Sequence, residues 1–307
     1  ANPYVWRFMA GVARMLLQPL FRVETENIDA IYRRRGAFLL VANHTAVIDP
    51  FLVGMLFRRP LHYVISDSQL RSRFLSVVLG LVGVIPKTKV IADLDTVKKI
   101  VMVKQNGGII GLFPEGQSGW DGHSLPIVKA TEKLVKSLKV PVVTAQLRGA
   151  YFSWPRWARS IRRGRVTISF KDLFEPEDLK ARSVDEVGEA LAEALRFDAF
   201  EDQEQRLVPF EGSRRAEYLE RALFVCPDCT SVDTLHSHRQ RLTCTRCGYT
   251  VRMNRYGFFE KRRGPLHFRT IREWNVWQLE EYRRYIDAIA DGSDPTETPI
   301  ISETAIE

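Results

Sequence analysis

The sequence has no apolar run long enough to cross a membrane. The longest, residues 74–85, reads FLSVVLGLVGVI and ends after twelve residues, whereas a spanning helix needs about 20 apolar residues. The N-terminus also lacks an apolar run followed by a small-residue cleavage site, so we expect no secretory signal peptide. These absences argue against a protein threaded through a bilayer and favour a globular protein, in which 45% of the residues are hydrophobic and 27% charged.

Cysteine is scarce, with four residues in a chain of 307. The four form two Cys-x-x-Cys pairs with fourteen residues between the pairs, which is the spacing of a zinc ribbon and not of a disulfide framework. They are Cys226, Cys229, Cys244 and Cys247. We expect their thiolates to bind one structural Zn²⁺, and we expect His236 and His238, between the pairs, to lie in a solvated loop.

Acidic residues are missing from two long segments. None occurs before Glu24, and none occurs in residues 133–170, which hold nine lysines and arginines. With a net charge of +8, the chain should present basic surfaces suited to phosphates, an anionic membrane or an acidic partner. A basic face that simply meets solvent is the plainer alternative.

Residues 3–22 have the periodicity of a helix with one apolar side. The apolar residues at helical spacing are Val5, Phe8, Met9, Val12, Leu16 and Leu20. Arg7 and Arg14 fall on the other side, so we expect residues 1–22 to associate with an anionic membrane, with Trp6 at the level of the headgroups. The protein would then be peripheral, on the cytoplasmic face of a membrane. A helix packed on its own domain is the alternative.

From residue 36 onward, strand-like apolar runs alternate with helical segments. The runs are 37–42, 61–65, 108–113, 140–147 and 165–170, and the helical segments are 50–58, 70–82, 93–105, 124–138 and 183–196. This alternation predicts an α/β fold, an αβ-sandwich with a mixed sheet, over residues 23–215. The small zinc ribbon should follow at 216–265, then a helix at 266–290 and a flexible tail at 291–307. Core packing is expected for the tryptophans of that helix, with membrane contact as the alternative.

The first strand-like run is followed at once by NHTAVID, residues 43–49. By itself, His44 fits a histidine at a strand end, and Asp49 fits the N-cap of the next helix. Chemistry offers a second interpretation, because a neutral imidazole can remove the proton of an attacking alcohol near pH 7. A carboxylate on the far nitrogen would hold the required tautomer, and four intervening residues let Asp49 turn back to His44.

Three further motifs follow along the chain. They are GVIPKTK at residues 83–89, GLFPEGQSGWDG at 111–122 and VPVVTA at 140–145. Together with NHTAVID, they resemble the four motifs of the glycerolipid acyltransferase family, which contains the 1-acylglycerol-3-phosphate acyltransferases. The first motif of that family, Asn-His followed by four residues and Asp, is matched in full, and the third, Phe-Pro-Glu-Gly, is matched in its core. The resemblance covers residues 36–170.

The resemblance implies an enzyme of phospholipid biosynthesis. It would move a fatty acyl group from acyl-CoA or an acyl carrier protein to the hydroxyl of a lysophospholipid, with 1-acylglycerol-3-phosphate as the favoured acceptor. His44 would be the base and Asp49 its orienter, with no catalytic cofactor. The acceptor-binding candidates are Asn43, Lys87, Lys89, Glu115, Gly116, Gln117 and Ser118. Glu115 has a structural alternative, as the residue that fixes its loop.

Two departures from the family pattern leave the acceptor open. Lys89 stands where the second motif usually ends in arginine, and Gln117-Ser118-Gly119 stands where the third often continues Thr-Arg-Ser. Those arginines would hold an acceptor phosphate, and lysine keeps the charge but not the bidentate geometry. A neutral or other lyso-lipid is therefore the alternative acceptor, unless Arg148, beyond the fourth motif, supplies the missing cation.

A nucleic-acid or protein-binding module built around the ribbon is the remaining alternative. Residues 239–263 hold eight lysines and arginines against one acid, a composition that suits nucleic acid. Such a module has no use for NHTAVID and FPEG together. We therefore expect a membrane surface, a thioester donor and a lyso-lipid acceptor as partners, and no nucleic acid.

Overall fold

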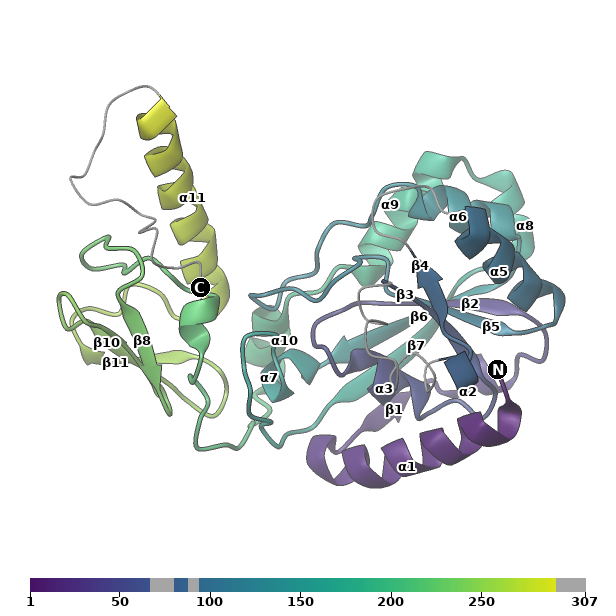
Figure 1. The fold of residues 1–307 in the computed structure, drawn as a ribbon, viewed down its shortest axis with the longest axis horizontal. Helices are drawn as coiled ribbons and strands as arrows, with labels where there is room; N and C mark the ends of the chain where they lie inside the picture. Colours follow the sequence, from purple (N-terminus) through teal and green to yellow (C-terminus); the bar gives the residue numbers. More distant parts are fainter. Residues whose placement is uncertain (67–79, 88–93, 291–307) are drawn as a thin grey trace.

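The computed structural model describes residues 1–66, 80–87 and 94–290, and in these residues two sheets set the architecture (Figure 1). The larger sheet has the strand order β1-β7-β6-β2-β5-β3-β4. Its strands are β1 (Glu24–Glu26), β2 (Phe38–Ala42), β3 (Leu61–Ser66), β4 (Ile85–Lys87), β5 (Ile109–Leu112), β6 (Val142–Arg148) and β7 (Thr167–Phe174). Strands β2 to β6 run parallel to one another, whereas β7 is antiparallel to β6 and parallel to β1. The mixed sheet expected from the sequence is confirmed.

Strand β2 lies in the middle of this sheet and is buried along its whole length. Phe38, Leu40 and Ala42 belong to one apolar core, and Leu39 and Val41 belong to the other. The reason is that successive side chains of a strand point to opposite faces. A central parallel strand covered from both sides has a continuous apolar sequence, as this run does.

Helices cover both faces of the larger sheet (Figure 1). The helices on the face of Phe38 are α1 (Pro3–Phe21), α2 (Asp29–Tyr32) and α3 (Asp49–Gly54). Those on the face of Leu39 are α5 (Leu94–Gln105), α6 (Thr131–Leu138), α8 (Pro176–Ala181) and α9 (Val184–Leu195). The αβ-sandwich predicted from alternating runs is therefore present, and its two cores fix β2 and the turn that follows it.

Helix α1 has one side on the domain and one side exposed. Asn2 caps it, because the Asn2 side chain accepts from the backbone N–H of Tyr4 at 2.9 Å. Trp6 is only 6% exposed, and its Nε1 donates to the carbonyl of Phe57 at 2.9 Å. The expectation that Trp6 lies at headgroup level is wrong, because the core offers its indole both apolar contact and an acceptor. The large apolar residues on the exposed side are Tyr4, Phe8, Met9, Met15 and Leu16.

The helix expected at residues 124–138 begins only at Thr131. Before it, Leu125 donates its backbone N–H to the Glu115 side chain, and Val128 donates to the carbonyl of Pro114. These bonds hold residues 124–130 in a non-helical path in place of about two helical turns, and the periodicity of the sequence does not reveal them. The helix expected at 70–82 lies largely outside the described residues. Within residues 1–66, 80–87 and 94–290, no helix has both the length and the apolar character that a membrane crossing requires.

The second sheet and the last helix form a C-terminal module, residues 216–290. Its elements are η2 (Leu219–Arg221), β8 (Leu235–His238), β9 (Arg241–Cys244), β10 (Thr250–Met253), β11 (Phe259–Arg263) and α11 (Ile271–Ala290). The sheet is antiparallel in the order β11-β10-β9-β8, and α11 lies beside it (Figure 1). Trp274 is fully buried, as expected for core packing. One apolar core joins this module to α7 (Ala150–Ser153) and α10 (Ala199–Arg206).

Candidate active site

The turn between β2 and α3 brings His44 and Asp49 together. Asp49 is the first residue of α3 and is fully buried, and its Oδ2 lies 3.1 Å from Nδ1 of His44. The same oxygen accepts from the backbone N–H groups of Thr45 at 2.7 Å and Ala46 at 2.8 Å. Because a carboxylate oxygen only accepts, this contact requires a proton on Nδ1, which leaves Nε2 as the acceptor nitrogen of the neutral imidazole. The geometry needed for a base and its orienter is therefore present.

The Phe113 ring lies against the His44 imidazole. The imidazole centroid lies 4.6 Å from that of Phe113, which in turn stacks with Tyr63 at 5.8 Å. The His44 side chain is 16% exposed, so only a small part of the ring meets solvent. Burial raises the pKa of Tyr63 well above its usual value, and its hydroxyl donates to the carbonyl of Pro50. Phe113 and Tyr63 thus form an uncharged aromatic side of the site, and Asp49 lies at Nδ1 of the imidazole.

Glu115 ties the His44 turn to the loop that follows β5. Its Oε1 accepts from the backbone N–H of His44 at 2.8 Å, and its Oε2 accepts from that of Leu125 at 2.7 Å. Burial raises the pKa of Glu115 to about 7, against the lowering effect of these two backbone donors. Both carboxylate oxygens hold backbone groups, which supports the structural alternative that the sequence left open for this residue.

The loop of residues 116–122 lies against the His44 turn. Gly119 donates its backbone N–H to the carbonyl of His44 at 3.3 Å. A Cβ on Gly119 would stand 2.7 Å from the carbonyl oxygen of His123, so the close approach requires glycine. Gly116 has a φ of 74°, in the left-handed region that also favours glycine. Gly116 and Gly119 are thus explained by a tightly folded loop that bonds to the backbone of His44.

Three of the acceptor-binding candidates are buried: Glu115, described above, Asn43 and Ser118. The side-chain amide of Asn43 donates to the Leu147 carbonyl at 3.1 Å and accepts from the Leu147 N–H at 2.7 Å. The Asn43 side chain therefore extends the hydrogen bonding between β2 and β6 by one residue beyond the end of β2. Ser118 is 5% exposed, and its backbone carbonyl accepts from Nη1 of Arg156 at 3.2 Å. Contact of these three candidates with a substrate stays a prediction.

The other candidates are accessible or lie outside the described residues. Gly116 and Gln117 are exposed on the 116–122 loop. Lys87 is exposed at the end of β4, at the edge of the larger sheet. Lys89 falls in residues 88–93, outside the described residues. The structure thus brings Glu115, Gly116 and the 117–119 backbone to the His44 turn, and the two lysines stay predictions.

Arg156, which the sequence motifs did not identify, lies over the 116–122 loop. Its guanidinium is 4.7 Å from the centroid of the Trp120 ring. Its Nη1 donates to the Gln117 side chain at 3.1 Å and to the Ser118 carbonyl at 3.2 Å. All three partners are uncharged, so none of them neutralises the guanidinium. The only sign of it in the sequence was its place in the acid-free segment 133–170.

Arg148, the cation suggested from the sequence, has different surroundings. It donates to the Gln146 side chain at 3.2 Å and lies 3.9 Å from carboxylate oxygens of Glu26 and Asp202. Two acidic neighbours already balance its charge. Of the two arginines, Arg156 is therefore the better placed to meet an anionic group beside the 116–122 loop.

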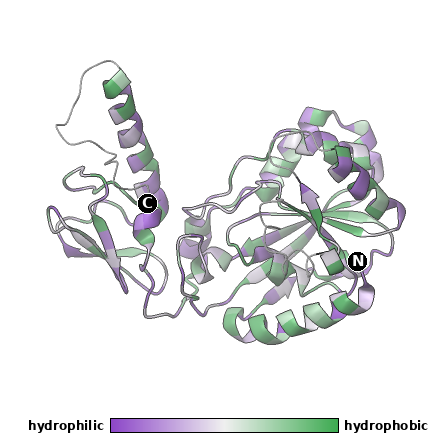
Figure 2. Ribbon diagram, in the orientation of Figure 1, coloured by the Kyte–Doolittle hydropathy of each residue, from purple (hydrophilic) through white to green (hydrophobic). Residues whose placement is uncertain are grey.

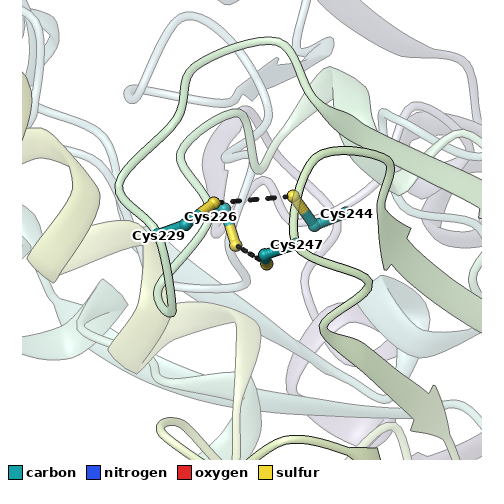
Figure 3. Close-up of side chains that lie close together, drawn as sticks. All are labelled: Cys226, Cys229, Cys244 and Cys247. Carbon is teal, nitrogen blue, oxygen red and sulfur yellow. Dashed lines mark hydrogen bonds between the residues drawn. The ribbon is translucent and has the colours of Figure 1, made fainter.

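Four thiols converge in the C-terminal module, from two facing turns (Figure 3). The sulfurs of Cys226, Cys229, Cys244 and Cys247 all lie within 4.8 Å of one another. The Cys226–Cys247 and Cys229–Cys244 sulfur separations are both 3.7 Å. Sulfurs placed tetrahedrally around an ion at about 2.3 Å, the usual Zn–S distance, would be about 3.8 Å apart. The cluster therefore fits a tetrahedral metal ion, as the spacing predicted.

The two histidines between the cysteine pairs stand outside this cluster. His236 and His238 lie on β8 and are exposed. The expectation of a loop was wrong, because β8 pairs with β9 in the antiparallel sheet. The expectation of solvent exposure is confirmed. Four thiolates leave no coordination position for either imidazole in a closed tetrahedral site.

Comparison with known proteins finds a family match over the segment that holds the four motifs. Residues 22–148 match the family model described as Acyltransferase. The chain is similar to the 1-acyl-sn-glycerol-3-phosphate acyltransferase of Cocos nucifera, at 22% identity over 189 residues, 60% of this chain and 58% of that protein. It is also similar to the protein of the same name from Borreliella burgdorferi, at 28% identity over 112 residues, 36% of this chain and 43% of that protein. The chain spans about half the length of these curated relatives.

A solved structure shares the fold. It is the crystal structure of the 1-acyl-sn-glycerophosphate acyltransferase PlsC from Thermotoga maritima, with a TM-score of 0.55 and 20% sequence identity. The match covers 66% of this chain and 80% of that one. The αβ-sandwich expected from the sequence is therefore also the fold of this solved structure.

Proposed function

We propose that the protein transfers a fatty acyl group from a thioester to the hydroxyl of a lysophospholipid, because residues 22–148 match the Acyltransferase family model. The donor would be acyl-CoA or an acyl carrier protein, and 1-acylglycerol-3-phosphate is the favoured acceptor. The observation that carries the proposal is the 3.1 Å contact between His44 and Asp49. It gives the family's first motif the geometry of a base and its orienter.

In this proposal His44 is the general base. Its Nε2 takes the proton of the acceptor hydroxyl as that oxygen attacks the thioester carbonyl carbon. The carbon–sulfur bond then breaks, and the imidazolium returns the proton to the leaving thiolate. Asp49 keeps the proton on Nδ1 in the resting imidazole and stabilises the imidazolium during the transfer. The chain needs no nucleophile of its own, because the lipid hydroxyl attacks.

The acceptor would bind beside the 116–122 loop. Arg156 offers a guanidinium whose partners there are uncharged, and a planar fork of donors suits a phosphate. This supports a phosphate-bearing acceptor although the third motif lacks its usual arginine. The second candidate is the same transfer to a neutral lyso-lipid, which the buried Ser118 at that motif position favours.

We also propose that the protein works on a membrane surface, as a peripheral protein of the cytoplasmic face. Figure 2 shows α1 hydrophobic over much of its length, and Tyr4 and Phe8 on its outer side are 80% and 70% exposed. Helix α1 packs on α3, where Phe51 is also exposed, as is Val47 in the His44 turn. Exposed apolar side chains grouped in this way are typical of a surface that meets lipid.

The metal of the cysteine cluster is proposed to be zinc with a structural role. Four thiolates at tetrahedral separations leave no open position for a water or substrate. Zinc bound there would supply folding free energy to a sheet whose strands are four or five residues long. Acyl transfer by His44 has no step that requires a metal ion.

A direct assay tests the acyltransferase proposal. The purified chain would be given acyl-CoA or acyl carrier protein thioesters, in separate reactions, with a mixture of phosphate-bearing and neutral lyso-lipids on vesicles. Products identified by mass should show an added acyl chain, first on 1-acylglycerol-3-phosphate. Products on neutral acceptors alone would establish the second candidate. No acylated product with any pair would refute the enzyme.

A further inference from the structure

The C-terminal helix contacts the 116–122 loop directly. Oδ2 of Asp121 accepts from Nη1 of Arg272 at 2.7 Å and from Nδ2 of Asn275 at 2.8 Å. Both donors lie in the first half of α11, more than 150 residues along the chain from Asp121. Asp121 itself is 5% exposed. A buried carboxylate that accepts a guanidinium and an amide is a strong link, because charge-assisted hydrogen bonds gain strength away from water.

The opposite side of the same loop is bound to the base. Gly119, two residues before Asp121, donates its N–H to the His44 carbonyl. Between the two, the Trp120 carbonyl accepts from the hydroxyl of Tyr151 at 3.1 Å, and the Trp120 ring carries Arg156. The loop therefore bridges the catalytic turn and α11. Its glycines give it much conformational freedom to lose, so it stays in one place only when such contacts hold it.

The position of α11 is set by the segment that carries the first metal ligand. The Trp274 indole donates to the carbonyl of Val225 at 2.9 Å, and Gln278 Oε1 accepts from the N–H of Phe224 at 2.9 Å. Trp274 and Gln278 are both fully buried. Val225 directly precedes Cys226, so the cysteine cluster, the start of α11 and the 116–122 loop form one continuous chain of contacts.

We propose that the C-terminal module positions the acceptor-binding loop of the acyltransferase domain, with Arg272 and Asn275 as positioning residues that act through Asp121. This inference rests on the proposed function. The acceptor meets a preorganised loop when α11 is in place, and a looser loop when it is not. The His44 imidazole does not depend on this link, because Asp49 holds the ring through Nδ1, whereas the 116–122 loop bonds only to the backbone carbonyl of His44. The effect should therefore fall on acceptor binding and leave proton transfer unchanged.

Simple attachment of the module is a different role, and other contacts already serve it. Phe200 of α10 and Phe258 of the module have ring centroids 6.2 Å apart in their shared core. Arg269 donates to Glu204 of α10 at 3.1 Å. These contacts would hold the module in place without Asp121. Loss of the Asp121 bonds can thus be separated from loss of docking.

The test compares Arg272→Ala and Arg272→Lys with the control Arg284→Ala. Arg284 lies on the same helix and pairs with Glu281, three residues before it. We expect Arg272→Ala to raise the acceptor KM by about tenfold, the effect of losing one buried charge-assisted hydrogen bond. The donor KM and kcat should stay within about twofold, and Arg272→Lys should recover part of the loss because it keeps the charge. Arg284→Ala should match the unchanged protein.

Hydrogen exchange provides a readout that does not depend on activity. Backbone amides of residues 116–122 should exchange faster in Arg272→Ala and in the milder Asn275→Ala, while those of β2 and β5 do not change. Chain stripped of metal with a chelator, with its metal content measured, should show the same faster exchange in this loop. Unchanged exchange and unchanged acceptor KM in both variants would overturn the proposal. So would an equal fall in every kinetic constant with a lowered melting temperature.

The kinetic measurement and the hydrogen-exchange measurement together distinguish failure of this proposal from failure of the proposed function. If the unchanged protein acylates no lyso-lipid, the proposed function fails, and the exchange measurement alone decides whether α11 holds the loop. If transfer occurs and Arg272→Ala behaves like Arg284→Ala in both measurements, only the positioning role is lost.

Discussion

The two loops that meet at the candidate site are held by partners at very different distances along the chain. The His44 turn is closed by Asp49, five residues later. The 116–122 loop is held by Arg272, 151 residues beyond Asp121. The first arrangement is a local one, a strand end and a helix start that bond within a single turn. The second exists only in the folded chain, so the base and the acceptor loop should respond to different changes.

Removal of the base should have the largest effect and should leave the acceptor loop unaffected. We expect His44→Ala to lower kcat by about a thousandfold, the usual contribution of a general base. The acceptor KM should change little, because Glu115 and Gly119 bond the backbone of His44 and not its ring. Asp49→Asn should also be severe, since the tautomer is no longer held. Steady-state kinetics on variants with unchanged circular dichroism measure this, and near-normal turnover by His44→Ala would refute the mechanism.

Loss of a metal ligand should affect the C-terminal module, whose helix α11 holds the 116–122 loop. Cys244→Ser should unfold β8 to β11 locally before the larger sheet responds, because metal binding is folding free energy for this module. Hydrogen exchange with metal analysis would show one ion per unchanged chain and rapid exchange in the variant. Thr243→Ser, on the same strand, is the control. A chain that purifies fully folded without metal would contradict the zinc ribbon.

Glu115 bonds the His44 turn to the loop that follows β5. Because its pKa is raised, its contribution to the free energy of unfolding should depend on pH. Its folded-state pKa of about 7 lies above the ordinary 4.5, so its stabilising contribution is complete below pH 4.5 and is lost as the pH rises through 7. Relative to Glu115→Gln, which does not titrate, the free energy of unfolding should fall by on the order of 3 kcal/mol over that range. Urea unfolding at several pH values measures this difference. A difference that stays constant with pH would mean that Glu115 is not buried as described.

Arg156 should affect the acceptor loop alone. We expect Arg156→Ala to raise KM for 1-acylglycerol-3-phosphate by about tenfold, as for loss of a charged hydrogen bond, and to leave KM for a neutral lyso-lipid unchanged. Arg159→Ala is a matched control, because Arg159 also stacks on an aromatic ring, that of Tyr218, at 4.7 Å. Parallel changes for both acceptors, or for both arginine variants, would remove Arg156 from the phosphate site.

The smallest effect is expected outside both loops, at the membrane. Phe8→Ser should weaken binding to anionic vesicles several-fold, because one exposed apolar side chain is lost from α1. Leu207→Ser removes a side chain of comparable exposure at the end of α10 and serves as the control. Sedimentation with vesicles compares them. Equal binding by both variants would indicate that another surface, such as the basic segment 133–170, meets the lipid.

The contrast between local and distant partners also explains which features could be predicted from the sequence. Strand β2 and the His44 turn were predicted correctly because apolar run, motif and partner all lie within residues 37–49. The cysteine cluster was predictable for a similar reason, since two short local motifs need only to face each other. Strands β1 and β4 are three residues long each, too short for any periodicity to appear.

The features that were missed depend on distant partners. Arg156 reaches the 116–122 loop because α7 and the following turn lie beside it in the folded chain, and no pattern around residue 156 shows this. Trp6 was wrongly expected at a membrane. Its indole donates to the carbonyl of Phe57, and nothing in the sequence around Trp6 indicates this distant partner. The link from Asp121 to α11 connects two segments whose local sequences show no sign of each other.

The long separation between Asp121 and Arg272 also sets an order of events during synthesis. A ribosome adds on the order of 5–20 residues each second, so Asp49 follows His44 within about a second. The residues of α11 follow Asp121 only after about ten seconds or more at the same rate. Throughout that interval the chain already holds both His44 and Asp49, while the 116–122 loop still lacks its partners on α11. In the proposed site, the contact that holds the His44 imidazole can therefore form early, whereas the 116–122 loop gains its bonds to Arg272 and Asn275 only after α11 has been synthesised.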